Sequence, residues 1–470
     1  MGKRPERDVG QLVLAIEPWD KAASDEASMA DRASDRPEAS TGAQSLGAER
    51  KRKAYTLYDK VYRDDVVWRG WLQVERNRGA AGSDGMTTAA AQEQLRPLLR
   101  GLRRELREKR YRPRPVRRCV IPKPGGGQRE LGIPCVRDRI VQTALVRVLE
   151  PIFERKFSDG SHGFRPNRGC QTALELVDGA VRDGCEWIVD ADIKRFFDTV
   201  DHEKLLDAVN EEVADGSVLH LIRLFLKAGV LAGSEKLEVE AGTPQGGPLS
   251  PLLANIYLHP LDTALKAHGY GFVRYADDFV VFARTRAEAE TALALIRQVL
   301  GDLGLELNEE KTRIAAISDG FEFLGFRYFR DPKGEVHKVV RRKSRAKFRE
   351  AIRQRSKRHA GQKRRKPKSC TVKKLQRDER LRRMIREVNA YLVAWHAYFR
   401  QVWRAGQYDF RDLDGFMRRR IRSAIAGRYA KGRWQSDILP NSLLADLGLL
   451  SLQQLHNMHL AGARAPSGPD

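Results

Sequence analysis

The stretch at 272–282, Phe-Val-Arg-Tyr-Ala-Asp-Asp-Phe-Val-Val-Phe, constrains this chain more than any other. Two short runs rich in valine and aromatic residues flank Asp277 and Asp278, which predicts a β-hairpin with both carboxylates at its turn. Clustered carboxylate oxygens are the ligands that a hard cation such as Mg²⁺ prefers. Adjacent acids are also common as solvated turn residues, so the metal-site interpretation depends on what else the sequence offers.

A second strand that ends in a carboxylate supports this interpretation. Residues 186–193, Glu-Trp-Ile-Val-Asp-Ala-Asp-Ile, alternate as a strand does and place Asp190 and Asp192 on the face opposite the apolar side chains. We expect Asp192, at the end of the strand, to take part in the chemistry. We expect Asp190 and the nearby Asp198 to be structural, in a salt bridge or a helix cap.

If the two strands are neighbours in one sheet, Asp192, Asp277 and Asp278 form a single carboxylate cluster. Such a cluster can hold two Mg²⁺ ions about 3.5 to 4 Å apart, one activating an attacking 3′-hydroxyl and the other steadying a leaving pyrophosphate. Adjacent strand residues point to opposite faces, so Asp277 is predicted as the principal ligand and Asp278 as the auxiliary one.

The charge of the chain indicates a polyanionic partner. A formal net charge of +24 and a pI near 10.0 predict attraction to a phosphate backbone and a salt-dependent affinity. The sequence shows neither a run of about 18 apolar residues that would span a bilayer nor a secretory signal. Five widely spaced cysteines without a C-x-x-C pair indicate reduced thiols in a cytosolic protein.

Basic and glycine-rich turns add candidate substrate contacts. Residues 114–134 are predicted to form a hairpin whose Pro- and Gly-rich tip carries Lys123 and Arg129. These two cations can close over a triphosphate, although a solvated basic loop explains the pattern equally well. In the turn at 161–169, an arginine is placed to contact a template backbone, and His162 is interpreted as a structural hydrogen-bonding residue.

Helices account for most of the remaining chain. Apolar spacing predicts helices over about 55–74, 88–109, 140–152 and 286–303, and another to about Ala267 with Ser250 as N-cap and Pro251 at the first helical position. Beyond Lys338 the composition becomes rich in Arg and Lys, as at 363–366, but apolar residues keep a helical period. This pattern predicts a small basic bundle that clamps nucleic acid.

Four motifs follow one another along the chain: Asp192 followed by Phe-Phe-Asp at 196–198, Thr-Pro-Gln-Gly-Gly-Pro-Leu-Ser-Pro at 243–251, Tyr-Ala-Asp-Asp at 275–278 and Phe-Leu-Gly at 323–325. This is the order found in reverse transcriptases, and the chain resembles bacterial group II intron-encoded proteins, which combine reverse transcriptase with maturase (RNA-splicing) activity. The similarity covers about residues 55–430.

This resemblance implies an α+β right-hand polymerase with fingers, a palm built on an antiparallel sheet, and a thumb, followed by a basic helical maturase bundle. The implied organisation is a flexible leader at 1–45, fingers and palm with an N-terminal extension at 46–335, the thumb and maturase domain at 336–435, and a tail at 436–470.

The resemblance also implies roles for single residues. Asp192, Asp277 and Asp278 match the family's ligands for two Mg²⁺ ions, and Lys123 and Arg129 match its triphosphate contacts. Two further residues match the nucleotide pocket: Phe197 is the bulky residue that blocks a 2′-hydroxyl and so favours deoxynucleotides, and Gln245 lines the pocket.

The implied function is to copy intron RNA into DNA by two-metal nucleotidyl transfer during retrohoming, and to bind the intron RNA so that it splices. The implied partners are intron RNA, target DNA with its primer strand, and dNTPs, in the bacterial cytoplasm and away from membranes. The chain stops at Asp470 with no cysteine beyond Cys370, so we expect the form without a Cys/His endonuclease. Insertion would then need another primer, such as a nascent strand at a replication fork.

Two other functions fit parts of the sequence. A splicing factor with a vestigial polymerase site would explain the basic bundle, but a pure RNA binder has no use for a carboxylate cluster that repels RNA. A stand-alone reverse transcriptase of a phage-defence or CRISPR-linked system would explain the motifs, but the thumb resembles that of a maturase. Intron RNA structure in the flanking DNA would separate these alternatives.

Overall fold

The computed structural model describes 56–122, 128–232, 235–237, 241–243, 246–358, 378–403, 406–426 and 439–462. The expected leader at 1–45, Lys123, Gln245 and the basic run at 363–366 lie outside these ranges, as does the side chain of Arg129. The chain divides into two compact units, Met1–Ile314 and Ala315–Asp470.

The first unit opens with helices α1 (Tyr58–Val61), α2 (Asp64–Arg76), α3 (Thr88–Glu93) and α4 (Leu95–Arg107). The prediction of one continuous helix over 88–109 is wrong, because the helix is interrupted at Gln94. Pro97 explains the interruption, since a proline ring clashes with the carbonyl four residues before it. That carbonyl belongs to Glu93, the last residue of α3.

The hairpin predicted at 114–134 is confirmed. Strand β1 (Val116–Pro122) pairs antiparallel with β2 (Gln128–Ile133). Two short strands, β4 (Val230–Ala232) and β5 (Glu235–Leu237), extend the pair to a sheet of order β2-β1-β4-β5. Helix α5 (Val136–Phe153) follows the hairpin and is buried along most of its length, which gives the hairpin a rigid base.

A second sheet contains both aspartate-bearing stretches. Its strands are β3 (Trp187–Asp192), β6 (Phe272–Tyr275), β7 (Asp278–Ala283) and β8 (Arg313–Ala316), in the order β6-β7-β3-β8. Alternate residues of β3 and β7 lie in the hydrophobic core, namely Val189, Ala191, Phe279 and Val281. Asp190, Asp192 and Asp278 therefore lie on the other face of the sheet, as the alternation predicted.

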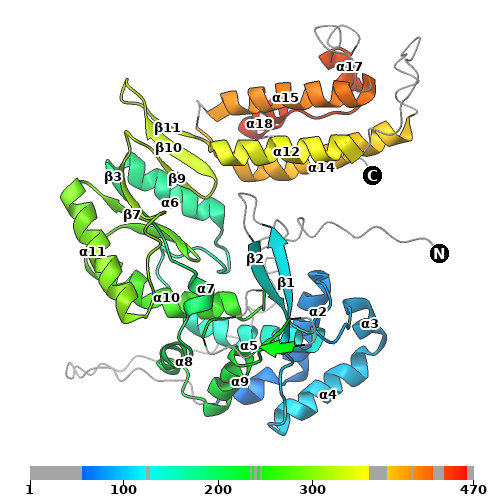
Figure 1. The fold of residues 1–470 in the computed structure, drawn as a ribbon, viewed down its shortest axis with the longest axis vertical. Coiled ribbons are helices and arrows are strands. Elements are labelled where there is room, and N and C mark those ends of the chain that lie inside the picture. The colour runs from blue at the N-terminus through cyan, green and yellow to red at the C-terminus, as the bar shows by residue number, and fades with distance from the viewer. Residues whose placement is uncertain are drawn as a thin grey trace, which may run out of the picture. The chain divides into compact units, whose positions relative to one another are not determined.

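The other described helices of the first unit are α6 (Cys170–Arg182), α7 (Phe196–Thr199), α8 (His202–Asn210), α9 (Gly216–Leu226), α10 (Ser250–Ala267) and α11 (Arg286–Asp302). Helix α11 lies along β3 and β7, and α10 packs against α11 (Figure 1). The predicted start of α10 is one residue late, because Leu249 is the N-cap and Ser250 is already helical. Pro251 permits this, since a proline is tolerated in the first turn, where its missing N–H is not needed.

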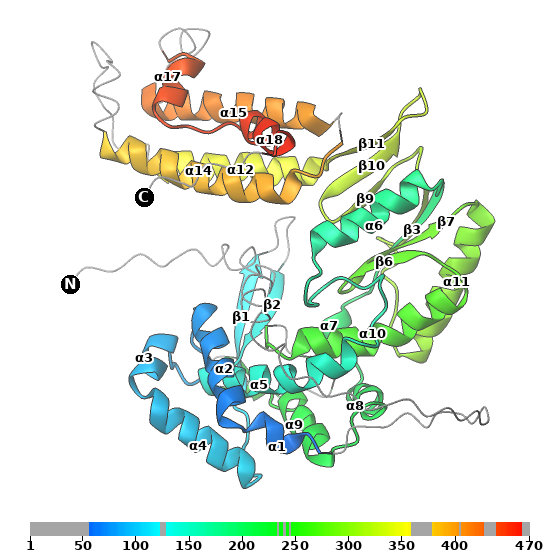
Figure 2. The ribbon, with the colours of Figure 1, turned by 180° about the vertical axis from the view of Figure 1, so that it is seen from behind.

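The second unit is a three-stranded antiparallel sheet followed by helices. Its elements are β9 (Phe321–Phe323), β10 (Phe326–Arg330), β11 (Val336–Val340), α12 (Arg342–Arg358), α14 (Glu379–Phe399), α15 (Gln407–Ala426), α17 (Asn441–Asp446) and α18 (Leu452–Leu460). Helix α12 lies beside α14 and α15 in both ribbon views (Figures 1 and 2). Phe348, Trp395 and Phe410 stack edge to face between these helices. The predicted basic helical bundle is confirmed.

Helices combined with mostly antiparallel sheets, in which the short β1–β4 pairing is parallel, confirm the predicted α+β class. Among the described helices, none combines the length and the apolar character that a bilayer crossing requires. The four described cysteines, at 119, 135, 170 and 185, form no disulfide with one another.

Candidate active site

The register between β3 and β7 places Asp192 directly opposite Asp278. Directly opposed residues of antiparallel strands point to the same face, with Cβ atoms about 4.5 to 5.5 Å apart. Both side chains are partly exposed on the face away from the core. Two carboxylates separated by 86 positions in the sequence are thus neighbours where β3 ends and β7 begins.

Asp277 lies in the turn between β6 and β7, next to Asp278. Tyr275 pairs with Asp278, so Ala276 and Asp277 are the two turn residues. Ala276 has φ +61°, in the left-handed region that costs a non-glycine residue about 1 kcal/mol or more. The strained turn sets Asp277 apart from the strand alternation, so the two neighbouring acids occupy different environments.

Asp192 already holds a cation from its own chain. The Lys311 ammonium donates to Asp192 Oδ2 at 2.6 Å, and Asn308 Nδ2 donates to the same oxygen at 3.3 Å. The Asn308 backbone N–H also donates to the Asp192 carbonyl at 2.8 Å, which fixes this loop to the end of β3. Neither contact was predicted from the sequence, which identified 308–312 only as part of the folded region.

The aspartates predicted to be structural do form salt bridges. Arg313 Nε lies 3.3 Å from Asp190 Oδ2, and Arg195 Nε lies 3.2 Å from Asp198 Oδ2. Asp190 shares the face of Asp192 but is neutralised from the neighbouring strand. It is therefore a matched reference for tests of Asp192 and its partners.

The three aspartates suit a divalent cation in their ligand chemistry, and the strand register brings Asp192 and Asp278 together. They offer hard oxygen ligands, and the ammonium at Asp192 shows that this edge of the sheet attracts positive charge. Their ligand atoms do not all lie within 4.8 Å of one another, a spacing that the described residues reach at Asp331, Glu335 and His337.

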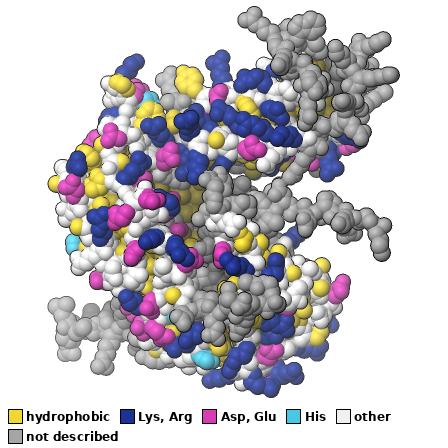
Figure 3. Space-filling model, viewed as in Figure 1, with side chains coloured by type: hydrophobic (Ala, Val, Ile, Leu, Met, Phe, Trp, Pro, Cys, Tyr) yellow, Lys and Arg dark blue, Asp and Glu magenta, His cyan; other side chains and the backbone are white. Residues whose placement is uncertain are grey.

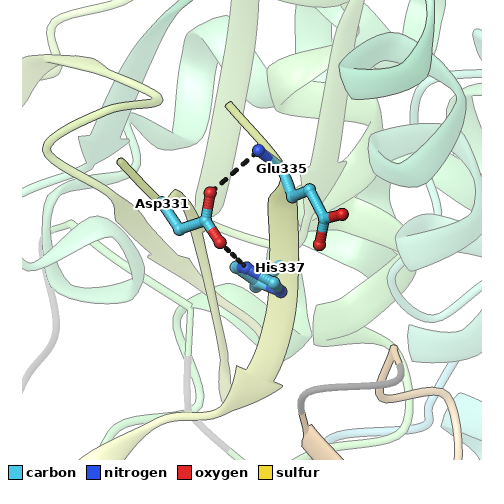
Figure 4. Close-up of side chains that lie close together, drawn as sticks. All are labelled: Asp331, Glu335 and His337. Atoms are coloured by element: carbon cyan, nitrogen blue, oxygen red, sulfur yellow. Dashed lines mark hydrogen bonds and ion pairs between the residues drawn. The ribbon is translucent and has the colours of Figure 1, made fainter. Parts of the chain in front are cut away.

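The Asp331 group is explained by its turn. It lies on the hairpin between β10 and β11, where Asp331 Oδ1 accepts from the backbone N–H groups of Lys333 and Glu335, both at 2.9 Å. Asp331 Oδ2 lies 2.9 Å from His337 Nε2, and the Glu335 contact drawn to Asp331 comes from the Glu335 backbone nitrogen (Figure 4). Hydrogen bonds to His337 and to the backbone lower the pKa of Asp331. The group closes a hairpin and needs no metal to account for it.

Phe197 lies beside the start of the glycine- and proline-rich turn. The Thr243 N–H donates to the Phe197 carbonyl at 2.7 Å, and the Gly242 N–H donates to the Val200 carbonyl at 2.8 Å. Gly242 has φ +92°, and a Cβ there would lie 2.7 Å from the Phe197 carbonyl oxygen. Two motifs far apart in sequence are therefore joined backbone to backbone, and the half-buried Phe197 ring packs against the hydrophobic core.

The same turn also reaches the β1–β2 hairpin. Gly246 has φ +117°, and a Cβ there would lie 2.7 Å from the carbonyl oxygen of Gly132 in β2. The hairpin that carries Lys123 and Arg129 at its tip and the turn that carries Gln245 thus meet at their bases. The three side chains themselves fall outside the described residues, so their predicted roles stay predictions.

The turn at 161–169 is held by its own arginines. Arg165 is 5% exposed and donates to Glu154 and to two backbone carbonyls, and Arg168 pairs with Asp159 at 2.7 Å. Both guanidinium groups are therefore engaged in holding this turn, not in reaching for a template. Burial, with the two arginines nearby, lowers the pKa of His162 to about 4, so its imidazole is neutral and structural, as predicted.

A buried arginine directly before the turn was not predicted. Arg274 and Asp262 are both 0% exposed and form a two-pronged ion pair, Nε to Oδ1 at 2.7 Å and Nη2 to Oδ2 at 2.5 Å. The sequence did contain a signal for this pair, since Arg274 is a charged residue inside an apolar strand. A buried cation requires a buried partner. Tyr275 is also largely buried, and burial followed by the neighbouring Cys170 raises the pKa of its phenol.

Unpaired cations gather on helix α12 of the second unit. Arg342, Lys343 and Lys347 are exposed and form no ion pair within the described ranges. Partial desolvation, then repulsion by Arg341 and Lys343, lowers the pKa of Lys347. The space-filling view shows many Lys and Arg side chains over the helices of this unit (Figure 3).

Comparison with known proteins gives one family match. The family "Reverse transcriptase (RNA-dependent DNA polymerase)" matches residues 121–328. This range runs from β1 to β10 and contains Asp192, Phe197, Asp277 and Asp278.

The chain is also similar to several curated proteins. Protein YkfC of Escherichia coli K12 is 36% identical over 53% of this chain and 76% of its own length. Group II intron-encoded protein LtrA of Lactococcus lactis is 40% identical over 44% of this chain but 34% of its own length. Nuclear intron maturase 1 of Arabidopsis thaliana is 36% identical over 20% of this chain and 13% of its own. The match to LtrA thus spans about a third of that protein.

Among solved structures, a chain of the partial Cas6-RT-Cas1–Cas2 complex is 25% identical over 56% of this chain and 44% of that chain. Its TM-score of 0.35 is too low to support a structural argument.

Proposed function

This chain belongs to the reverse transcriptases of the type encoded by group II introns, and we propose that it copies RNA into DNA at the edge of the β6-β7-β3-β8 sheet. The observation that carries the proposal is the β3–β7 register, which sets Asp192 opposite Asp278 beside the turn residue Asp277. Reverse transcriptases use divalent metal ions such as Mg²⁺, and these three carboxylates are the residues that would hold them.

The residues of the chain have separate tasks in this proposal. Asp192, Asp277 and Asp278 bind the cations, which when bound neutralise the transferring phosphoryl group and activate the primer 3′-hydroxyl. Lys311 neutralises Asp192 when no metal is bound. Lys123 and Arg129 at the hairpin tip meet the triphosphate, and Gln245 lines the nucleotide pocket; these roles rest on the family resemblance.

Phe197 sets the choice of sugar. Its backbone is fixed to Thr243 and its ring is half-buried, which supports a fixed ring; its place against the 2′ position of the sugar rests on the family resemblance. Phe197→Ala should lower the preference for dCTP over CTP, measured as the ratio of kcat/KM values, by about tenfold or more, because a pocket that loses a bulky group admits the extra hydroxyl. Phe197→Tyr, which keeps the ring, is the control, and an unchanged ratio in Phe197→Ala would refute the steric role.

We further propose that the second unit binds the intron RNA and assists its splicing, with target DNA and its primer strand as the other partners during retrohoming. The relatives named as intron-encoded proteins and intron maturases favour this second role. It is tested by in-vitro splicing of the flanking intron RNA with and without the protein. Splicing that is equally fast in both would remove the maturase role and leave the polymerase.

The exposed cations of α12 should set the salt dependence of RNA binding. Replacing Arg342, Lys343 and Lys347 with Gln should reduce the slope of log K against log salt by about 2 if each contacts one phosphate of a single strand. The measurement is RNA affinity across a salt series.

A matched control exists on α14. Arg382, Arg383 and Arg386 are also exposed, but each pairs with Glu379 or Glu387 at 3.0 to 3.2 Å. Replacing these three should change the slope less. Equal slopes for the wild type and the α12 variant would make the α12 cations a solvated face with no role in binding.

A further inference from the structure

The carboxylate turn rests on a buried polar network. The Arg274 guanidinium donates from Nη1 to the Ala276 carbonyl and to Asn255 Oδ1, both at 3.0 Å, and from Nη2 to Ser161 Oγ at 2.9 Å. Asp262 fixes the other edge of the guanidinium through two further bonds. Every nitrogen of this guanidinium therefore has a defined acceptor, and one acceptor is the turn itself.

The turn is also held from its outer side. The segment 160–163 runs beside β6, where the Arg274 N–H donates to the Gly160 carbonyl at 2.8 Å and the His162 N–H donates to the Arg274 carbonyl at 2.9 Å. A Cβ on Gly163 would lie 2.5 Å from the Ala276 nitrogen, so this backbone approaches the turn as closely as glycine allows. Asn255 Nδ2 donates to the Gly163 carbonyl at 2.8 Å and so links both supports.

We propose that Arg274 is a positioning residue that fixes Asp277 and Asp278 for metal binding through its bond to the Ala276 carbonyl. Ala276 is the residue before Asp277 and adopts a left-handed conformation. Such strain persists only where the surroundings over-determine the backbone, and the network supplies that constraint. Mutating a group that orients a metal ligand commonly costs about 10- to 100-fold in metal affinity or activity. This inference rests on the proposed function.

A lysine side chain cannot replace the Arg274 guanidinium. A lysine ammonium can keep one bond to Asp262, but it lacks the planar fork that also reaches Asn255 and Ala276. Arg274→Lys therefore retains the buried charge pair while releasing the turn. Asn255→Ala is a second, milder variant, because it keeps the ion pair and loosens the turn at Arg274 and at Gly163.

Ser161→Ala is the matched control. Like Asn255→Ala, it removes one acceptor of the same guanidinium, but the Ser161 hydroxyl has no contact with the turn or with Gly163 among the described hydrogen bonds. If the network only stabilises the fold, the two variants should bind Mn²⁺ equally well. If the network positions the turn, Asn255→Ala should bind Mn²⁺ more weakly than Ser161→Ala.

The experiment measures Mn²⁺ binding to the full chain by electron paramagnetic resonance, with melting temperature and RNA-templated DNA synthesis recorded on the same samples. Arg274→Lys and Asn255→Ala should weaken Mn²⁺ binding by about tenfold or more, while Ser161→Ala stays within about twofold of wild type. Excess metal should restore part of the lost synthesis. If Arg274→Lys does not fold, Asn255→Ala against Ser161→Ala decides the question.

The outcomes separate this inference from the proposed function. If the wild type copies RNA in an Asp277-dependent manner but folded Arg274→Lys and Asn255→Ala bind Mn²⁺ normally, the proposed function stands and the inference falls. If Asp277→Ala binds Mn²⁺ as well as the wild type does, the carboxylates do not form the metal site, and both fall.

Discussion

Asp277→Ala is expected to lower Mg²⁺-dependent DNA synthesis on an RNA template by about a thousandfold or more, because a lost metal contact removes several kcal/mol of transition-state stabilisation. RNA affinity should not fall, since a carboxylate repels the RNA backbone and the cations that attract RNA lie elsewhere. The measurement is single-turnover primer extension, with RNA binding measured beside it.

Asp190→Ala is the control for this prediction. Asp190 lies on the same face of β3 as Asp192, but it pairs with Arg313 and its register partner on β7 is Val280 and not an aspartate, so its loss should leave synthesis nearly intact. Retained synthesis in Asp277→Ala would remove this residue from the mechanism. Equal losses in both variants would point to damage to the sheet and not to a lost ligand.

Asp262→Ala is expected to lower the free energy of unfolding by about 3 to 5 kcal/mol, the usual cost of leaving a buried charge without its partner. Both members of this ion pair are fully buried, and Arg274 would keep hydrogen bonds to neutral groups only. The measurement is urea denaturation followed by circular dichroism and tryptophan fluorescence.

Glu290→Ala provides the contrast. The Arg286–Glu290 pair on α11 is spaced i,i+4, and its side chains are 70% and 56% exposed. Exposed pairs contribute about 0.5 kcal/mol or less, because water and salt screen them. If Asp262→Ala proves no more destabilising than Glu290→Ala, the buried network does not hold the first unit together.

Local patterns in the sequence were sufficient to predict the elements of the site. Valine-rich runs around Asp277 predicted a hairpin, and alternation around Asp192 predicted a strand with the carboxylate at its end; the structure confirms both. The family, the α+β class and the basic helical bundle were also predicted correctly. These predictions succeeded because each depends on residues close together in the sequence.

Contacts between segments far apart in the chain could not be predicted from the sequence. Nothing near Asp192 indicates that Lys311 will bind its carboxylate, because that contact depends on how the loop after α11 returns to β3. The pairing of Arg274 with Asp262 likewise depends on packing between β6 and α10. A buried charge signals that a partner exists without saying which one.

The helix break at Gln94 had a local signal that apolar spacing hides. Spacing alone gave one helix over 88–109, whereas the clash caused by Pro97 separates α3 from α4. The spacing of apolar residues indicates which face of a helix is buried, but it gives no information about where a proline interrupts the backbone.

The measurement that tests the central claim most directly is primer extension by the wild-type chain on a defined RNA template with dNTPs, with and without Mg²⁺. The account predicts a DNA product that ends at the template's 5′ end and forms only when the metal is present. The contradicting result is a chain that binds the template–primer but fails to extend it, whichever divalent cation is added and whether the template is RNA or DNA. That result would rule out a polymerase site at Asp192, Asp277 and Asp278.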